Sequence, residues 1–145
     1  MTMTRCEQAV HCFSQNFNCA QAVLGVYCQE LGLDKETALK LTSGFGGGMR
    51  CGEVCGAVSG AVMAIGLKYG FGTDKDPDKK AKTNEMVMKF HKLFSEENGT
   101  IICKDILTYD ITKKEDMEII LKEDLFNTIC PDMVASAVEI LEDML

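Results

Sequence analysis

The sequence predicts an all-α protein, a single-domain compact bundle of about six to eight helices. The chain has 145 residues but only 2 prolines, and apolar residues recur at helical spacing along most of it. No stretch alternates between apolar and polar residues for long enough to form a strand. A chain of this length buries roughly 70% of its unfolded surface. We therefore expect residues 1–145 to form one cysteine-rich helical domain.

Two helices are expected at the start of the chain. The first covers Met3–Ser14. The second starts at Asn16 or Asn18, because either side chain can cap a helix, and it runs to Leu31, where Gly32 ends it.

The middle of the chain predicts a short helix, a glycine-rich loop and a longer apolar helix. Asp34 caps the short helix, which runs from Lys35 to Leu41 or Ser43. The longer helix spans about Gly52 to Tyr69, with a small residue at every fourth position: Gly52, Gly56, Gly60 and Ala64. Glycine costs about 1 kcal/mol relative to alanine inside a helix. This face therefore needs a close neighbour, either a packed helix or a bound cofactor.

Two helices follow in the next part of the chain. A long one spans Pro77–Glu97, with proline at its first position and Asn98-Gly99 at its end. Thr100 is expected to cap a short helix that carries Cys103 and Leu107.

Two more helices complete the predicted bundle. Thr112 and Glu115 have the spacing of a capping box, which opens a helix through Leu121. The last helix opens at Cys130-Pro131-Asp132 and runs to Leu145. Three of its apolar residues lie off the main stripe, namely Met133, Ile140 and Met144. So broad an apolar surface fits a deep core or a homodimer contact.

Charge and hydropathy exclude two classes of function. The net charge is −7, whereas a general nucleic-acid binder needs clustered Lys and Arg. The longest uncharged apolar stretch lies between Glu53 and Lys68 and is shorter than the ~20 residues that span a bilayer. The first residues form no apolar run of the secretory type. We therefore expect a cytoplasmic protein without nucleic-acid binding or membrane insertion.

The chain has 8 cysteines, and in a reducing compartment such a number favours metal or redox use over disulfides. Four predicted helices begin at or near a cysteine. We predict that these helix starts converge, so that one site is formed by the sulfurs of Cys19, Cys55, Cys103 and Cys130, with or without Cys51. The remaining three are predicted to be small buried hydrophobic residues: Cys6, Cys12 and Cys28.

Cys51 and Cys55 stand four residues apart where the glycine loop joins the apolar helix. Residues i and i+4 share one helix face, so both sulfurs are expected to face one point. A thiol at a helix N-terminus ionises more readily than usual. Arg50 is expected to attract a small anion, to stabilise a thiolate, or to be an ordinary surface arginine. The predicted cofactor-binding residues are Gly47, Gly48, Arg50 and Gly56.

Several of these segments resemble a known family of small redox-active proteins, named for the cysteine pattern C-GCAxxG-C-C. The segments that carry the resemblance are Asn18-Cys19-Ala20-Gln21-Ala22-Val23-Leu24, Gly46-Gly47-Gly48, Cys55-Gly56-Ala57-Val58-Ser59-Gly60, Cys103 and Cys130. The resemblance covers nearly the whole chain. It implies that Cys19, Cys55, Cys103 and Cys130 are the signature cysteines and that Cys51 is an addition. Similar domains occur attached to electron-transfer modules, which implies an iron–sulfur centre or a dithiol couple.

We predict a thiol-based redox protein, either an oxidoreductase or an electron-transfer protein, that acts with an unidentified redox partner protein. In one form, Cys19, Cys55, Cys103 and Cys130 ligate an iron–sulfur cluster or another metal. In the other form, Cys55 is the nucleophile of a dithiol–disulfide couple, and Cys19, Cys51 or another signature cysteine resolves it.

Two further classes of function compete with this prediction. The alternative is a non-catalytic module in which the same thiolates hold zinc or another soft metal for structure, storage or sensing. A hydrolase or transferase needs a histidine beside Cys55, but His11 and His91 lie in predicted helices remote from it in sequence. The glycine loop also lacks the Lys-Ser/Thr of a nucleotide-binding P-loop.

Overall fold

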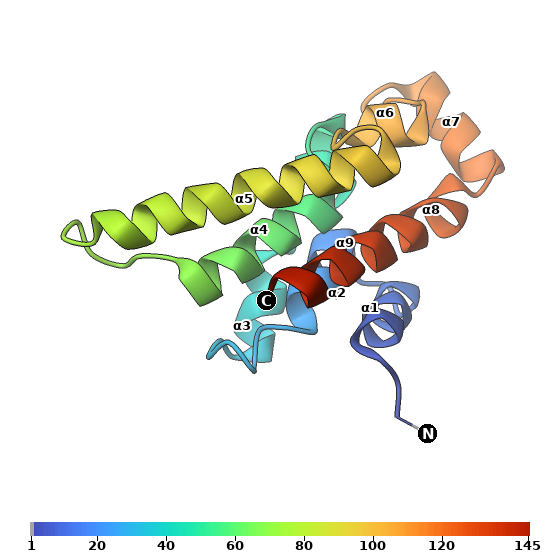
Figure 1. Cartoon of the computed structure of the whole chain (residues 1–145). Coiled ribbons are helices and arrows are strands. Elements are labelled where there is room, and N and C mark those ends of the chain that lie inside the picture. Colours follow the sequence, from blue (N-terminus) through green and yellow to red (C-terminus); the bar gives the residue numbers. More distant parts are fainter. Residues whose placement is uncertain (1) are drawn as a thin grey trace.

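The computed structural model describes residues 2–145, and this range folds into nine α-helices and one irregular turn, without an extended strand (Figure 1). The all-α class is thereby confirmed. The elements are α1 (Arg5–Ser14), α2 (Cys19–Gly25), α3 (Lys35–Leu41), the turn η1 (Gly48–Gly52), α4 (Gly56–Tyr69), α5 (Pro77–Asn98), α6 (Cys103–Leu107), α7 (Lys114–Lys122), α8 (Leu125–Thr128) and α9 (Cys130–Met144).

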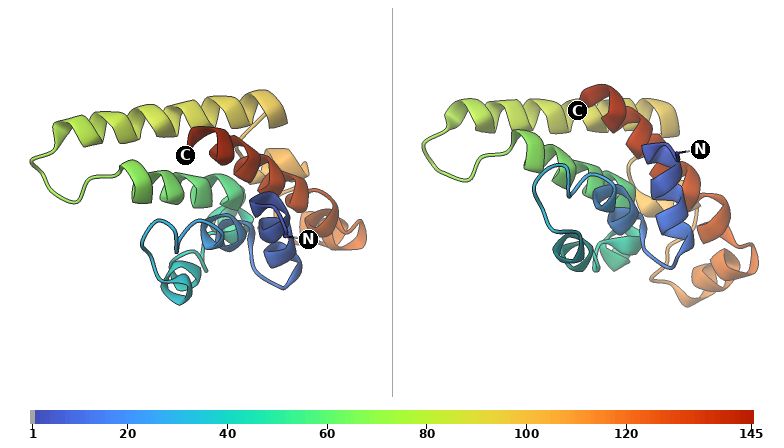
Figure 2. Two further views of the ribbon diagram at one scale, coloured as in Figure 1. Left: turned by 60° about the horizontal axis from the view of Figure 1, so that its bottom comes forward. Right: turned by 90° about the horizontal axis from the view of Figure 1, so that it is seen from below.

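Helix α5 packs along α4 and α9, and α1, α2 and α3 lie on the other side of these two helices (Figures 1 and 2). The main core fills the space between the helices, and its largest side chains are fully buried: Leu24, Ile65, Phe90, Phe94 and Leu141. The short helices α6, α7 and α8 gather at one end of the molecule (Figure 1).

The small-residue face of α4 packs against α2. A Cβ atom on Gly60 would lie 2.7 Å from the carbonyl oxygen of Ala20, and one on Gly56 would lie 3.1 Å from the Ala20 nitrogen. Side chains at these two positions would push the helices apart. Of the two predicted neighbours for this face, the structure therefore places a packed helix against Gly56 and Gly60.

A second, smaller core lies under α6, α7 and α8. Its buried residues are Cys103, Leu107, Ile111 and Ile120. Cys130 packs against this core and also against the main one, which contains Cys19 and Cys55. The start of α9 therefore lies at the seam between the two cores.

Helix α2 begins as predicted but ends at Gly25 rather than Leu31. The Asn18 side chain accepts a hydrogen bond from the N–H of Gln21, and the Gln21 side chain accepts one from the N–H of Asn18. This reciprocal capping fixes the N-terminus of the helix. After Gly25 the chain continues in tight turns to Gly32, whose φ of 89° suits glycine.

Two predicted threonine caps are wrong. Helix α6 is preceded directly by Ile102, and the Thr100 hydroxyl accepts from the Ile102 N–H outside the helix. Helix α7 begins at Lys114, and the Thr112 hydroxyl donates to Asp110 instead of capping it. Threonine readily forms such local bonds in turns, and here they replace the helix cap. Helix α8 was not predicted.

The off-stripe residues of α9 are explained by the chain's own core. Ile140 and Met144 are each 8% exposed and belong to the main core, and Met133 packs against it. The deep-core explanation therefore suffices for them, and a homodimer stays a prediction. No helix among the described residues has the length and apolar character needed to span a membrane.

Candidate functional site: the four-cysteine cavity

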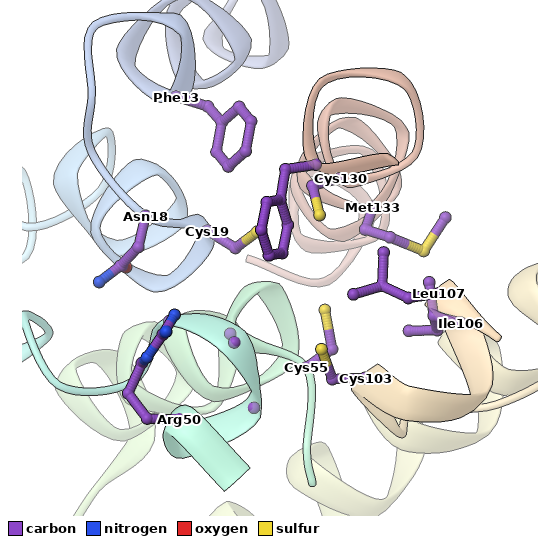
Figure 3. Close-up of a pocket in the computed structure, with 15 residues that line it drawn as sticks. Phe13, Asn18, Cys19, Arg50, Cys55, Cys103, Ile106, Leu107, Cys130 and Met133 are labelled. Atoms are coloured by element: carbon purple, nitrogen blue, oxygen red, sulfur yellow. The ribbon is translucent and has the colours of Figure 1, made fainter. Parts of the chain in front are cut away.

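One cavity lies where α2, α4, α6 and α9 begin, and Cys19, Cys55, Cys103 and Cys130 all line it (Figure 3). In Figure 3 their sulfur atoms point toward a shared space. The cavity volume is about 190 Å³, and its wall is completed by apolar side chains: Phe13, Ile106, Leu107, Phe126 and Met133. The helix starts thus converge as expected, while the chemical role of each cysteine stays a prediction.

Cys19 and Cys130 enter the cavity as the first residues of α2 and α9. The position of Cys19 is fixed by Asn18, which caps α2 and also donates from its amide to the carbonyls of Thr42 and Ser43. The start of α2 is therefore tied to the segment that follows α3.

Cys55 and Cys103 are brought together by one antiparallel bridge between Val54 and Ile102. The backbone N–H of each cysteine donates to a carbonyl of the opposite segment, with N···O distances of 2.8 Å for Cys55 and 2.6 Å for Cys103. Each cysteine directly follows a bridge residue, so the backbone places the two side chains diagonally on the same face of the bridge.

Three of the four thiols are strongly buried, because Cys19, Cys55 and Cys103 are only 6–8% exposed. Burial raises the pKa of Cys55 to about 11, although backbone N–H groups at the start of α4 lower it in part. Burial likewise raises the pKa of Cys103 to about 12. Both side chains are therefore neutral thiols near pH 7 unless a bound group displaces their protons.

Cys19 and Cys130 behave as an interacting pair. Hydrogen bonding with Cys130, followed by burial, raises the pKa of Cys19 well above its usual value. The same interaction lowers the pKa of Cys130. Cys130 is also only half-buried. Of the two, Cys130 is the thiol that ionises first.

The loop before α4 is a left-handed turn. Gly47, Gly48, Met49 and Arg50 have φ values between 57° and 64°. Glycine adopts this conformation freely, but each of the other two residues loses about 1 kcal/mol or more in it. A Cβ on Gly48 would lie 2.8 Å from the Cβ of Cys103. Glycine at this position therefore lets the turn approach Cys103.

Arg50 lines the cavity together with Gly47, Gly48 and Gly56, so the predicted cofactor-binding residues surround the same space as the cysteines. A Cβ on Gly47 would lie 3.0 Å from a terminal nitrogen of Arg50, which places the guanidinium directly over this glycine. Arg50 lowers the pKa of Cys103, though by less than burial raises it. The positive charge of Arg50 therefore acts on the Cys103 thiol inside the cavity.

Cys51 lies outside the cavity lining. It is exposed within η1, and its Sγ donates to the carbonyl of Gly48 at 3.3 Å. The expectation that Cys51 and Cys55 share one helix face is wrong, because α4 begins only at Gly56. The left-handed turn and the bridge at Val54 take the preceding stretch out of helical conformation. Any catalytic role for Cys51 stays a prediction.

The remaining candidates lie elsewhere. Cys28 is buried in the main core, and Cys6 and Cys12 are half-buried and pack against it. Neither His11 nor His91 lines the cysteine cavity. The described residues therefore place no histidine in the cavity to activate one of its thiols.

The sequence did not indicate the aromatic wall of the cavity. Phe13 comes from α1 and Phe126 from the unpredicted helix α8. No motif marks either residue. Met133 was the one residue of the wall whose position in the sequence was informative. It lies off the main apolar stripe of its helix, so it must pack against apolar residues other than those that cover the stripe.

The four thiols surround the cavity rather than meet at a point. Within residues 2–145, no three His, Cys, Asp or Glu side chains lie close enough to hold one metal ion, and no two cysteines form a disulfide. A zinc ion needs its thiolate sulfurs at about 2.3 Å. The arrangement as it stands is therefore not that of a closed single-ion site.

Comparison with known proteins places the chain in a family. No curated protein and no solved structure gives a significant match. A family model matches residues 17–144, a range that contains the left-handed turn and all four cysteines of the cavity. The chain therefore belongs to the family described as "Putative redox-active protein (C_GCAxxG_C_C)".

Proposed function

We propose that the protein performs thiol–disulfide exchange from the four-cysteine cavity, with Cys130 as the attacking thiol and Cys19 as its resolving partner. The observation that carries this proposal is that Cys19 and Cys130 begin two contacting helices and line one cavity, where their interaction lowers the pKa of Cys130 and raises that of Cys19. An attacking thiol needs thiolate character and access. Cys130 is half-buried, whereas Cys55 is 6% exposed with a pKa of about 11. These properties favour Cys130 over Cys55 as the nucleophile.

The exchange balances in two steps. The Cys130 thiolate attacks one sulfur of a substrate disulfide, which forms a mixed disulfide and releases one substrate thiolate that takes up a proton. Cys19 then loses its proton and attacks the Cys130 sulfur, which releases the second substrate thiol. Two electrons and two protons have passed from the protein to the substrate. A dithiol donor protein reverses the change by reducing the Cys19–Cys130 disulfide.

The test uses protein with Cys51→Ser, which removes the exposed thiol from the background. Reduced protein is mixed with hydroxyethyl disulfide, released thiol is counted, and the protein disulfide is mapped by mass spectrometry. We expect two released thiols per chain and a Cys19–Cys130 disulfide. Adding Cys130→Ser should abolish rapid release, whereas adding Cys28→Ser, at a buried cysteine outside the cavity, should not. Equal release by both variants would refute the proposal.

A second candidate function is electron transfer by a cysteine-ligated iron–sulfur cluster. One observation favours it, namely that Cys55 and Cys103 face the same cavity as the Cys19–Cys130 pair. Four thiolates are the usual donor set of such clusters, whose ligands bind separate irons and so stand farther apart than those of one zinc ion. A bound cluster would supply one-electron chemistry. The chain would supply the four thiolates and an apolar wall that limits solvent access.

Anaerobic purification followed by metal analysis and a visible spectrum decides between the two functions. Iron, sulfide and visible absorbance that disappear in Cys55→Ser would support the cluster. Colourless protein with one zinc per chain would support the non-catalytic metal module instead. Metal-free protein that still performs the exchange would support the dithiol couple.

A further inference from the structure

The cysteine cavity has one charged side chain on its wall. Among the lining residues that the structure describes, Arg50 alone carries a charge, and the others are cysteines, glycines, apolar residues and Asn18. The amide nitrogen of Asn18 donates to two backbone carbonyls and its oxygen caps α2. Since the chain has a net charge of −7, an anion is repelled by the molecule as a whole and needs a local cation to approach the thiols.

Arg50 has no partner of its own among the described residues. None of their ion pairs or side-chain hydrogen bonds includes it, whereas Arg5 forms ion pairs with both Glu30 and Glu142. Arg50 is an exposed residue of the left-handed turn, and its guanidinium lies over Gly47, beside the cavity. A strained backbone that presents an unpaired guanidinium to a cavity is a feature typical of a binding site.

We infer that Arg50 is the substrate-binding cation of this cavity, and that the substrate is a small disulfide with a carboxylate near its sulfur atoms. The inference rests on the proposed thiol–disulfide exchange and names its substrate class. A guanidinium binds a carboxylate through two parallel N–H···O hydrogen bonds. With the carboxylate on Arg50, the rest of the molecule extends into the apolar, thiol-lined space. The cavity of about 190 Å³ is below the roughly 300–1,000 Å³ of pockets for drug-sized ligands, so the substrate is small.

A purely electrostatic role for Arg50 makes a different prediction. Its charge lowers the pKa of Cys103, and an effect on the thiols alone would change exchange with every disulfide by the same factor. A substrate-binding role changes exchange only with disulfides that carry a negative charge. The charge of the substrate therefore separates the two roles.

The experiment measures second-order exchange rates in the Cys51→Ser background with three disulfides. These are dithiodipropionate, which carries two carboxylates, neutral hydroxyethyl disulfide and doubly positive cystamine. The variants are Arg50→Gln, Arg50→Lys and, as the matched control, Lys104→Gln. Lys104 is a nearby surface cation that pairs with Glu53 outside the cavity lining. Circular dichroism verifies that each variant is folded.

We expect Arg50→Gln to slow exchange with dithiodipropionate about five- to tenfold, the scale of one lost ion pair. Exchange with hydroxyethyl disulfide should change less than about twofold, and cystamine should react at least as fast as before. Arg50→Lys should restore part of the rate, and Lys104→Gln should leave all three rates near their original values. Equal slowing with all three disulfides would overturn the inference.

Binding of adipate, a shorter dicarboxylate without a disulfide, tests the inference apart from redox chemistry. Adipate should shift amide resonances of residues around the cavity in the original protein but not in Arg50→Gln. Equal binding, or none, in the two proteins would overturn the assignment of Arg50. If no disulfide exchanges while adipate still binds through Arg50, the exchange function fails and the anion site stands.

Discussion

Cys55 and Cys103 lie diagonally across the antiparallel Val54–Ile102 bridge and on the same face of it, because each directly follows one partner of the bridge. Their alignment comes from backbone hydrogen bonds rather than from contacts of the sulfur atoms. Either sulfur can therefore be changed without removing the bonds that position it. The site thus lends itself to single substitutions that test chemistry separately from folding.

The four cavity thiols and the exposed thiol of Cys51 should react with iodoacetamide at different rates. At pH 7 we expect Cys51 and Cys130 to be alkylated before Cys19, Cys55 and Cys103. Cys51 is exposed, and Cys130 is half-buried with a lowered pKa, while the other three are buried with raised pKa values. Peptide mapping by mass spectrometry gives the order. Alkylation of Cys55 ahead of Cys130 would contradict the assignment of the attacking thiol.

The buried thiol of Cys55 should make the fold less stable in alkali. Its pKa is about 11 in the folded protein against a usual value of 9.0, so folding favours the neutral form. The resulting stabilisation is fully present below pH 9 and is lost as the pH rises through 11. It amounts to at most about 2.7 kcal/mol.

Urea unfolding at several pH values measures this loss. Cys55→Ser should flatten the decline in unfolding free energy between pH 9 and 11, whereas Cys51→Ser, at an exposed thiol, should retain it. An equally steep decline in Cys55→Ser would show that Cys55 is not its source.

Two glycines of α4 should respond oppositely to substitution by alanine. Gly60→Ala places a Cβ 2.7 Å from the carbonyl oxygen of Ala20 and should cost roughly 1–3 kcal/mol through overpacking. Gly66→Ala meets nothing within 4 Å and should stabilise the helix by about 0.5–1 kcal/mol. Chemical denaturation of both variants is the check. A neutral Gly60→Ala would mean that α2 and α4 can separate at no cost.

Removing the Asn18 cap should lower the stability of the fold and make Cys19 react faster with alkylating reagents. Asn18→Ala loses the cap of α2 and the two bonds to the segment after α3, so we expect a cost of about 1–2 kcal/mol. Asp34→Ala removes the cap of α3 and is the matched control. Only Asn18→Ala should speed alkylation of Cys19. Equal alkylation of Cys19 in both variants would argue against a local role for Asn18.

The sequence was most informative where a local rule decides the structure. Asn18 and Asp34 cap helices as predicted, and Gly99 ends α5 in a left-handed conformation. The last helix opens at Cys130, as predicted. Capping and helix termination depend on a few neighbouring residues, so a sequence pattern is enough to find them.

The sequence was least informative where distant segments decide the local conformation. Spacing alone suggested a shared helix face for Cys51 and Cys55, but the left-handed turn and the bridge from Val54 to Ile102 keep that stretch out of helical conformation. The pairing of Cys19 with Cys130 likewise depends on how α9 packs beside α2. Such contacts join residues far apart in the chain, and helical periodicity contains no information about them.

The cysteines of the cavity belong to two different hydrophobic cores, so bonds between their sulfur atoms would affect how firmly the two cores are held together. Cys103 belongs to the small core beneath α6, α7 and α8, and Cys19 and Cys55 belong to the main core. A disulfide or cluster that joined Cys103 to either of them would link the two cores covalently, and its loss would leave them held by packing and by the backbone hydrogen bonds of the Val54–Ile102 bridge. The oxidation state of a few sulfurs would then set how easily one end of the molecule can open.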